Sequence, residues 1–288
     1  TFTSGDKTYV NPEPRIALSY KLKSDLALKA SYATMNQYLH LLSNSGVGLP
    51  TDLWVPATEK VKPQNSQQVA LGLAKDFEKQ NFSLTLEGYY KTMNNIIGYK
   101  EGASFLGIQD GGDGAESITW EDNITSGQGI SYGGEVLLQR KQGKLTGWVG
   151  YTMSWTTQQF DELNNGEKFF ARYDRRHDIS VVGIYELKDN ITLSATWVYG
   201  TGNAITLPLS TYELGSLGGN QYGEQFGFNR NGTEYTSRND FRMRSYHRAD
   251  IGIQVSKEKK RGVRTWEFSA YNLYNRKNPF YYTIGAEE

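Results

Sequence analysis

Residues 15–32 read RIALSYKLKSDLALKASY, and this stretch decides the fold. Every second residue is apolar on both sides of a short polar break at Lys23-Ser24-Asp25. A period of two gives a β-strand one apolar face and one polar face, whereas a helix would need a period near 3.6. The stretch therefore predicts two antiparallel strands joined by a tight turn.

The same alternation recurs in four further pairs of segments. They are Val69–Leu73 with Phe82–Leu86, Tyr132–Leu138 with Leu145–Trp155, Ile179–Tyr185 with Ile191–Trp197, and Ile251–Val255 with Trp266–Ala270. Val182 and Ile184 break the pattern, because they place apolar groups among polar ones. All seven prolines fall outside strand interiors, as a hydrogen-bonded ladder requires. The chain is predicted to be all-β, with about ten strands.

Composition excludes several classes of protein. The 288 residues contain no Cys, which rules out disulfides, thiolate metal sites and cysteine nucleophiles. Lys+Arg and Asp+Glu are 31 each, so the basic footprint of a nucleic-acid-binding protein is missing. No apolar run reaches the length of a transmembrane helix, but a transmembrane barrel needs only alternation.

Connection lengths identify the kind of β protein. The turn inside each predicted pair is short, as at Lys188–Asn190 or Lys257–Val263, whereas the connections between pairs are long, as at Asn36–Ser66 and Gly200–Tyr246. Short periplasmic turns and long extracellular loops are typical of outer-membrane barrels. Aromatic residues near both strand ends agree with this interpretation. A soluble β-sandwich would show the same alternation and stays an alternative.

The alternation also predicts which side chains meet lipid. The apolar set, with Leu71, Leu84, Val149 and Leu193, is expected to face outward. The charged strand residues Lys29, Glu87, Glu135, Asp250 and Glu267 all belong to the polar set. We expect this set to face the lumen, as at Ser83, Glu87, Glu135, Ser194 and Glu267. The first strand enters a short turn and the tenth leaves one, so both ends emerge on the long-loop side. We therefore expect an open sheet, part of a larger barrel, whose first and tenth strands do not pair.

Residues for catalysis do not converge in the sequence. The three histidines, His40, His177 and His247, are scattered in or beside the long connections, and we expect no enzyme activity, no metal site and no cofactor. Ligand contacts are expected in the long loops, where aromatic and cationic side chains stack and hydrogen-bond. The candidate ligand-binding residues are Tyr38, His40, Trp54, Arg172 and Arg175.

Several motifs together resemble one family. They are Asn11-Pro12-Glu13-Pro14-Arg15, Leu53-Trp54-Val55-Pro56, Glu87-Gly88-Tyr89-Tyr90-Lys91, Arg175-Arg176-His177-Asp178 and Asn272-Leu273-Tyr274-Asn275. From about Asn11 to Tyr282 the chain resembles TonB-dependent outer-membrane receptors, above all the branch with a carboxypeptidase-regulatory-like N-terminal domain. The resemblance implies a barrel of 22 strands around an N-terminal plug, with uptake driven by the TonB complex.

The resemblance sets expectations for organisation and partners. Residues 1–288 would form one partial barrel domain without the plug, in the outer membrane of a Gram-negative bacterium. The partners would be outer-membrane lipid, the plug and remaining barrel, the TonB complex and a surface lipoprotein, and the cargo a nutrient such as a siderophore, peptide or glycan. Two alternatives stay open: a passive porin, and an outer-membrane protease or lipase barrel, which a self-closed ten-strand barrel would favour.

Overall fold

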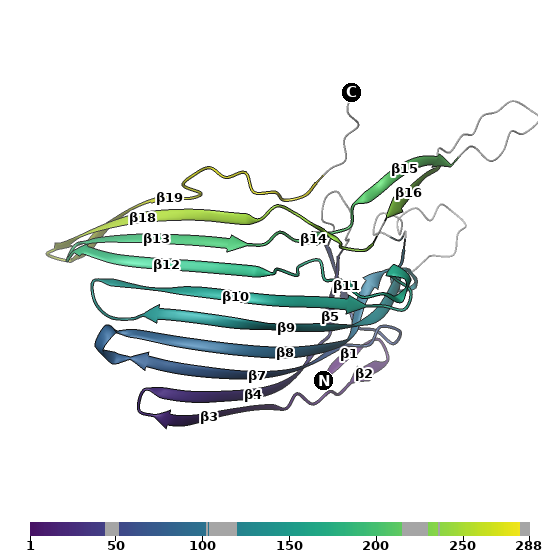
Figure 1. The fold of residues 1–288 in the computed structure, drawn as a ribbon, viewed down its shortest axis with the longest axis horizontal. Coiled ribbons are helices and arrows are strands. Elements are labelled where there is room, and N and C mark those ends of the chain that lie inside the picture. Colours follow the sequence, from purple (N-terminus) through teal and green to yellow (C-terminus); the bar gives the residue numbers. More distant parts are fainter. Residues whose placement is uncertain (44–51, 102, 104–119, 215–229, 236, 283–288) are drawn as a thin grey trace, which may run out of the picture.

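The structure is a computed structural model, which describes residues 1–43, 52–101, 103, 120–214, 230–235 and 237–282. Its main feature is one antiparallel wall of ten long strands, which follow one another in chain order (Figure 1). Their bounds are β3 (Arg15–Lys23), β4 (Leu26–Gln37), β7 (Gln64–Phe77), β8 (Phe82–Tyr99), β9 (Ile124–Arg140), β10 (Leu145–Gln159), β12 (His177–Lys188), β13 (Ile191–Gly200), β18 (Tyr246–Lys259) and β19 (Gly262–Ala270).

Short elements stand at the long-connection end of the wall. They are the hairpins β1 (Phe2–Ser4) with β2 (Lys7–Tyr9), β5 (Leu39–Ser43) with β6 (Asp52–Pro56), and β15 (Pro208–Leu214) with β16 (Arg230–Tyr235), the pair β14 (Ala204–Ile205) with β17 (Phe241–Arg242), and β11 (Phe169–Phe170) beside β10. Helical structure among the described residues is limited to the 3₁₀ turns η1 (Glu78–Gln80), η3 (Trp120–Asn123) and η4 (Asn164–Gly166). In the described ranges no helix has the length and apolar character needed to cross a membrane.

All five predicted strand pairs form as antiparallel hairpins. Ile16 pairs with Tyr32 and Leu18 with Ala30, which keeps the apolar residues of β3 and β4 on one face. The predicted turn at Lys257–Val263 is wrong in extent, because β18 and β19 continue in register as far as Lys259 and Gly262. Gly262 accommodates this tight turn with a φ of 145°. The last hairpin therefore projects beyond its neighbour β13 (Figure 1).

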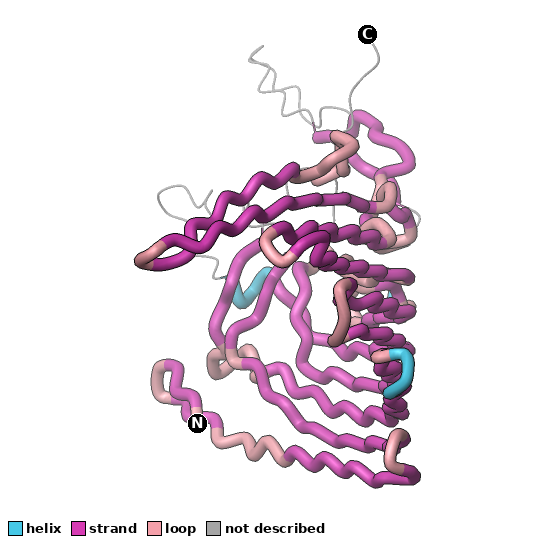
Figure 2. The backbone as a smooth tube through the Cα atoms, turned by 90° about the vertical axis from the view of Figure 1, so that its left-hand side faces the viewer, coloured by secondary structure: helices cyan, strands magenta, loops and turns pink. Residues whose placement is uncertain are grey.

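The wall is open. β3 and β19 stand at its two ends, and among the described residues they pair only with β4 and β18. Figure 2 shows the wall curving without closing on itself. Two strands with unpaired backbone on one side are incompatible with a complete membrane barrel. The expectation of an open sheet is confirmed, and the chain is a fragment of a larger barrel.

Curvature distinguishes the two faces of the wall. On β7, Val69 and Leu71 are 48% and 60% exposed, whereas Ala70 between them is 4% exposed. The glycines show the same difference in crowding. Gly72 belongs to the same set as Ala70, and a Cβ atom added to it would lie 3.2 Å from a backbone oxygen. Gly183 belongs to the apolar set, and a Cβ atom added to it would have no neighbour within 4 Å. The polar set therefore lines the crowded concave face, and the apolar set covers the convex face.

Buried apolar residues gather away from the middle of the wall. One cluster joins Leu42, Val55, Val61, Tyr99 and Ile124 across β5, β6, β8 and β9. A second cluster contains Ile96, Phe160, Leu163 and Phe169. A single-layer wall has no interior of its own, so the folded loops at its rim supply the buried core. These clusters fix the position of the β5–β6 hairpin and of the connection after β10.

Candidate functional site: the concave wall and the loops at its rim

The concave wall carries a pair of opposed carboxylates. Glu87 on β8 lies directly opposite Glu135 on β9. Side chains opposite each other in an antiparallel pair have Cβ atoms about 4.5–5.5 Å apart, and like charges there are destabilising. In the described part of the chain neither carboxylate lies within 4.0 Å of a cationic group. The wall therefore presents an acidic pair that this chain does not neutralise.

Lys29 belongs to the same lateral row of the sheet. It pairs with Gly72, which in turn pairs with Glu87, so a residue without a side chain separates the cation from the carboxylate. The row borders a hollow of 260 Å³ on the concave face, whose lining includes Ser19, Lys29, Ser31, Ala70, Gly72 and Glu87. Small residues in this row leave space for another layer of protein or for solvent.

Further along the wall the concave face becomes apolar. Trp148 lies opposite Val182, and Ile184 follows two residues later on the same face. The Trp148 ring leans over Gly150, where an added Cβ would lie 3.2 Å from it. Val182 and Ile184, which broke the alternation in the sequence, thus contribute to an apolar patch on an otherwise polar wall. Such a patch is suited to pack against another protein surface rather than to line a water channel.

The β5–β6 hairpin stands at the rim. His40 and Leu42 on β5 share its buried face with Val55, while Leu39, Asp52 and Trp54 lie on the other face. Trp54 is 61% exposed, although it is one of the largest apolar side chains of the chain. An exposed indole on a hairpin whose other face is buried offers a flat surface on which a ligand can stack.

Two neighbouring polar residues are tied to this exposed face. Arg172 forms an ion pair of 3.7 Å with Asp52, and the Tyr173 hydroxyl donates a hydrogen bond of 2.9 Å to the same carboxylate. Burial and this hydrogen bond raise the pKa of Tyr173, so the phenol stays protonated and remains a donor at neutral pH. The connection after β11 is thereby fastened to the β5–β6 hairpin, 121 residues away in sequence.

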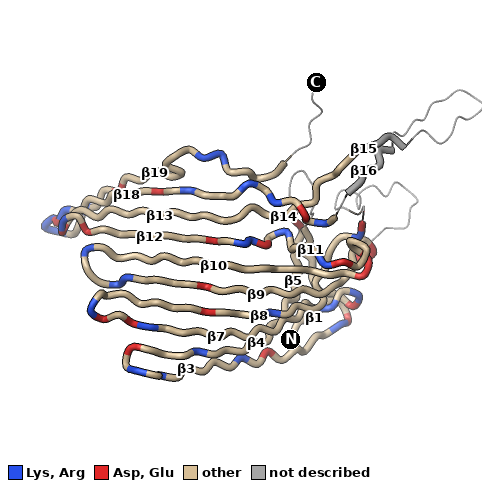
Figure 3. The backbone as a smooth tube through the Cα atoms, in the orientation of Figure 1, with Lys and Arg blue, Asp and Glu red and all other residues tan. Residues whose placement is uncertain are grey.

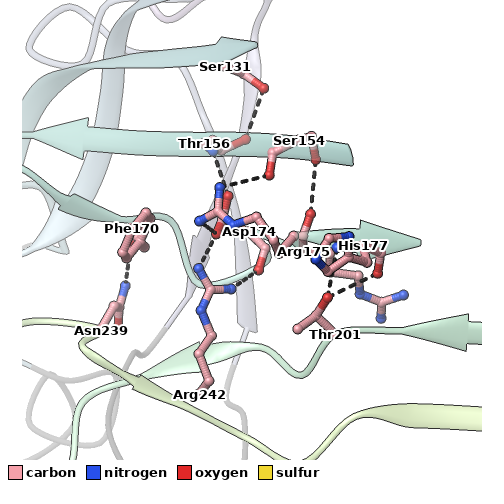
Figure 4. A network of polar contacts seen from close by, with 11 residues as sticks. Ser131, Ser154, Thr156, Phe170, Asp174, Arg175, His177, Thr201, Asn239 and Arg242 are labelled. Atoms are coloured by element: carbon pink, nitrogen blue, oxygen red, sulfur yellow. Dashed lines mark hydrogen bonds and ion pairs between the residues drawn. The ribbon is translucent and has the colours of Figure 1, made fainter. Parts of the chain in front are cut away.

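A second connection is fastened through Asp174, whose side chain is fully buried (Figure 4). Its carboxylate accepts a hydrogen bond from the Thr156 backbone on β10 and pairs with Arg242 of β17 and with Arg176. Arg242 also donates to the Asp174 backbone carbonyl. A buried carboxylate needs such compensation, since an unpaired one would be costly to desolvate. Asp174 therefore links β10, the connection before β12 and β17.

Aromatic rings surround the two arginines. The Arg176 guanidinium lies 4.5 Å from the Trp155 ring and 5.3 Å from the Phe170 ring, and Arg242 lies 4.9 Å from Phe170. Burial lowers the pKa of Arg176, although an arginine stays charged at any physiological pH. Asn239 adds a hydrogen bond of 2.8 Å to the Phe170 carbonyl. Cation–π contacts and charge-assisted hydrogen bonds thus hold the rim in one arrangement.

The structure separates the predicted ligand-binding residues into different environments. Trp54 is exposed beside Asp52, the partner of Arg172. His40 is 1% exposed, so its ring packs inside the hairpin. Tyr38 stacks on Phe2 at 5.0 Å, and Arg175 pairs with Asp178 at 3.3 Å. Asp52, the ion-pair partner of Arg172, lies two residues before Trp54 on the same face of β6. Trp54 and Arg172 are therefore the two of the five that we keep as candidates for ligand contact.

Histidines 177 and 247 do not form a cluster. The His177 ring lies 2.9 Å from the Tyr151 hydroxyl, and the His247 ring lies 2.7 Å from the Tyr274 hydroxyl, each on its own pair of elements. Within the described ranges no three His, Cys, Asp or Glu side chains lie close enough to hold a metal.

Sequence reasoning missed the buried Asp174 and the direct opposition of Glu87 and Glu135. Asp174 belongs to the run Tyr173-Asp174-Arg175-Arg176, where a charged residue in a long connection carries no sign that it is buried. The alternation placed Glu87 and Glu135 on the correct face, but their opposition depends on the register between β8 and β9. A bulge between Asn94 and Ile96 shifts this register only beyond the pair, toward the rim.

An open, curved wall of long antiparallel strands with an apolar convex face defines a segment of an outer-membrane β-barrel. The family model described as "TonB dependent receptor-like, beta-barrel" matches residues 1–275. The chain therefore belongs to this family. No curated protein matches the chain in sequence.

Solved structures show the same fold. The ferric-catecholate import receptor Fiu from Escherichia coli K12 is 17% identical with a TM-score of 0.52, and the match covers 92% of this chain and 31% of that one. The ferripyoverdine receptor of Pseudomonas aeruginosa is 13% identical with a TM-score of 0.56, covering 92% and 29%. The FrpB iron transporter from Neisseria meningitidis is 12% identical with a TM-score of 0.55, covering 92% and 35%. The chain spans about a third of the length of these receptors.

Proposed function

We propose that the intact protein to which this wall belongs is a Gram-negative outer-membrane receptor that imports a nutrient with energy from TonB. The concave face carries the proposal, because its acidic pair and its apolar patch both lack a partner among the described residues. A water-filled pore needs no apolar patch, and a lipid-facing surface tolerates no carboxylates. A plug domain that fills the barrel would satisfy both.

The acidic pair defines the chemistry of that contact. Two carboxylates held side by side attract a guanidinium or ammonium group, which relieves their repulsion and forms charge-assisted hydrogen bonds. We propose that a basic side chain of the plug occupies the space in front of Glu87 and Glu135. The apolar patch around Trp148 and Val182 would pack against apolar plug residues.

The rim supplies the ligand contact in this proposal. Trp54 offers a stacking surface, and the largely buried Arg172 holds the carboxylate of Asp52 on the same hairpin face. A siderophore, a peptide and a glycan each present groups that fit this pair. Because the structural neighbours include a ferric-catecholate receptor and a ferripyoverdine receptor, ferric siderophores form the first panel to test.

Uptake by cells that produce the full-length receptor tests the proposal. A radiolabelled ligand from a panel of ferric siderophores, peptides and oligosaccharides should accumulate in these cells and not in a tonB deletion strain. Equal accumulation in both strains would indicate a passive pore and contradict energised transport. Binding at the cell surface should persist in the deletion strain, since capture precedes the energised step.

A further inference from the structure

Positive charge collects at the short-turn end of the wall (Figure 3). Residues 21–25, 75–81, 140–144, 186–190 and 257–264 contain thirteen Lys or Arg and six Asp or Glu, while the whole chain is neutral. This asymmetry is independent of the rim and of the concave wall. The positions of the individual cations on their strands show whether this charge lies on the convex or the concave face.

Three of these cations share one geometry. Lys75 lies 5.1 Å from the ring of Phe77, Arg140 lies 5.4 Å from Phe82, and Arg264 lies 5.5 Å from Trp266. In each pair, the cation and the ring lie at positions of the apolar set, on the same face of the sheet as the apolar residues of their strands. The register agrees, because Phe77 lies opposite Phe82, and Phe82 lies opposite Arg140. All three pairs therefore stand on the convex, lipid-facing side, at the end of the apolar band.

The last hairpin adds a pair of opposed cations. Lys257 on β18 lies directly opposite Arg264 on β19, two residues beyond the Val255–Trp266 pair. Like charges at this spacing repel, so the arrangement is unfavourable without a counterion. In the described part of the chain none of Lys75, Arg140, Lys257 and Arg264 lies within 4.0 Å of a carboxylate. Glu258 and Asp76, the acidic neighbours in sequence, belong to the concave set.

We infer that these convex-face cations form binding sites for the headgroups of anionic phospholipids in the periplasmic leaflet, with the site at Lys257, Arg264 and Trp266 the most developed. The inference rests on the proposed outer-membrane location and goes beyond the proposed transport. The aromatic ring lies at the depth of the glycerol backbone, and the cation beside it reaches the phosphate. The opposed cations Lys257 and Arg264 share one phosphate, which removes their repulsion.

A lipid fits these sites better than a free anion or an acidic protein. Each cation continues directly from the apolar band, as at Val255 and Lys257, so a bound headgroup leaves its acyl chains against the convex face. Charge near a membrane surface attracts anionic lipid by about 1 kcal/mol per Lys or Arg, or about fivefold in affinity. Phosphatidylglycerol should therefore be preferred to a zwitterionic lipid.

The test is electron paramagnetic resonance of spin-labelled lipids around the full-length receptor reconstituted in phosphatidylcholine vesicles. The fraction of motionally restricted label gives the association constant of phosphatidylglycerol relative to phosphatidylcholine. The wild-type protein should prefer phosphatidylglycerol several-fold, and the variant K75Q/R140Q/K257Q/R264Q should lose at least half of that preference. Lys257→Arg with Arg264→Lys should retain it, because both charges remain.

Controls separate the possible outcomes. Heat-modifiable electrophoretic mobility verifies that each variant is folded, and the variant K100Q/K168Q, outside the short-turn end, should keep the wild-type preference. Equal fractions of motionally restricted phosphatidylglycerol and phosphatidylcholine around the wild-type protein would overturn the inference. That result would not affect the proposed transport function. The preference for phosphatidylglycerol could also disappear in sodium phosphate but persist in sodium chloride of equal ionic strength. That result would assign the sites to free phosphate and would also overturn the inference. The absence of any restricted lipid would contradict the membrane location itself.

Discussion

Glu87 on β8 lies directly opposite Glu135 on β9, and both carboxylates face the concave side of the wall. This relationship is unfavourable within the wall and becomes favourable when a cation stands before it. Lys29 lies in the same row, beyond Gly72, and forms no ion pair with Glu87. The pair therefore distinguishes an empty barrel from one that holds a basic partner.

Neutralising the pair should have opposite effects in the two situations. In a plug-deleted receptor, Glu135→Gln should raise the free energy of unfolding by about 0.2–1 kcal/mol, since it removes a repulsion. In the full-length receptor the same change should weaken plug docking by about 1.5–3 kcal/mol, since a charge-assisted hydrogen bond is lost. Denaturant titration measures both, and entry of a large antibiotic into cells reports plug displacement. Stabilisation in both proteins would mean that no basic group approaches the pair.

Asp174→Asn should loosen the rim without unfolding the wall. The substitution leaves Arg176 and Arg242 without their shared carboxylate, and both arginines are partly exposed, so we expect a local loss of about 1–3 kcal/mol. Hydrogen exchange should accelerate in residues 171–176 and 239–243 while β8 and β9 keep their protection. The matched control Arg175→Gln removes a solvent-exposed ion pair and should change exchange by less than about 0.5 kcal/mol. Equal effects of the two variants would show that Asp174 fastens nothing.

His40 should make the β5–β6 hairpin sensitive to acid. Burial lowers the pKa of His40 below its usual 6.5, only partly offset by the Lys62 backbone, so the folded hairpin holds the neutral ring. The stability that the hairpin gains from the neutral ring is fully present above pH 6.5, the pKa of an unfolded histidine. It is lost as the pH falls through the lower pKa of the folded state, and the loss is about 1.4 kcal/mol for each pH unit between the two pKa values. Hydrogen exchange of residues 39–43 and 52–56 at pH 7.5 and pH 5 measures this loss. His40→Gln should abolish the pH dependence, whereas His177→Gln on β12 should leave it in place.

Trp54→Ala should weaken ligand capture by the full-length receptor about fivefold or more, because central aromatic contacts commonly contribute over 1 kcal/mol. Arg172→Ala should act in the same direction, because it releases Asp52 from its ion pair. Phe268 is a matched control, since it is also 61% exposed but lies on the convex face. Surface plasmon resonance with the ligand found by uptake gives the affinities. Unchanged affinity in both rim variants would place the ligand site elsewhere.

The wall was largely predictable from the sequence, because a period of two needs no information from distant residues. Ile16, Leu71 and Val149 each lie on the face that their neighbours predict. Residues whose environment depends on contacts between separate connections were not predictable. His40 was expected as a ligand contact, but pairing of β5 with β6 turns it inward, and neither segment alternates long enough to indicate this.

The apolar patch on the concave face shows a second limit. Val182 and Ile184 contradicted the alternation and indicated only that their strand was unusual. Their meaning depends on Trp148, which lies opposite Val182 across the β10–β12 pair. Cross-strand neighbours 34 residues apart are set by register, and register follows from turn lengths that vary by one or two residues. The extension of β18 and β19 past the predicted turn is an example of that variation.

The central claim is that the apolar set faces lipid and the polar set faces the lumen, and site-directed spin labelling tests it most directly. The 288 residues contain no cysteine, so a single cysteine placed among them meets no competing thiol in this part of the receptor. In lipid vesicles, nitroxides at Leu71, Leu84, Val149 and Leu193 should be relaxed by oxygen, which concentrates in the bilayer. Nitroxides at Ser83, Ser194 and Glu267 should be relaxed less by oxygen and more by a water-soluble nickel chelate wherever water enters the lumen. Oxygen accessibility that peaks at Ser83 and Ser194, or that shows no period of two along β8 and β13, would contradict the account.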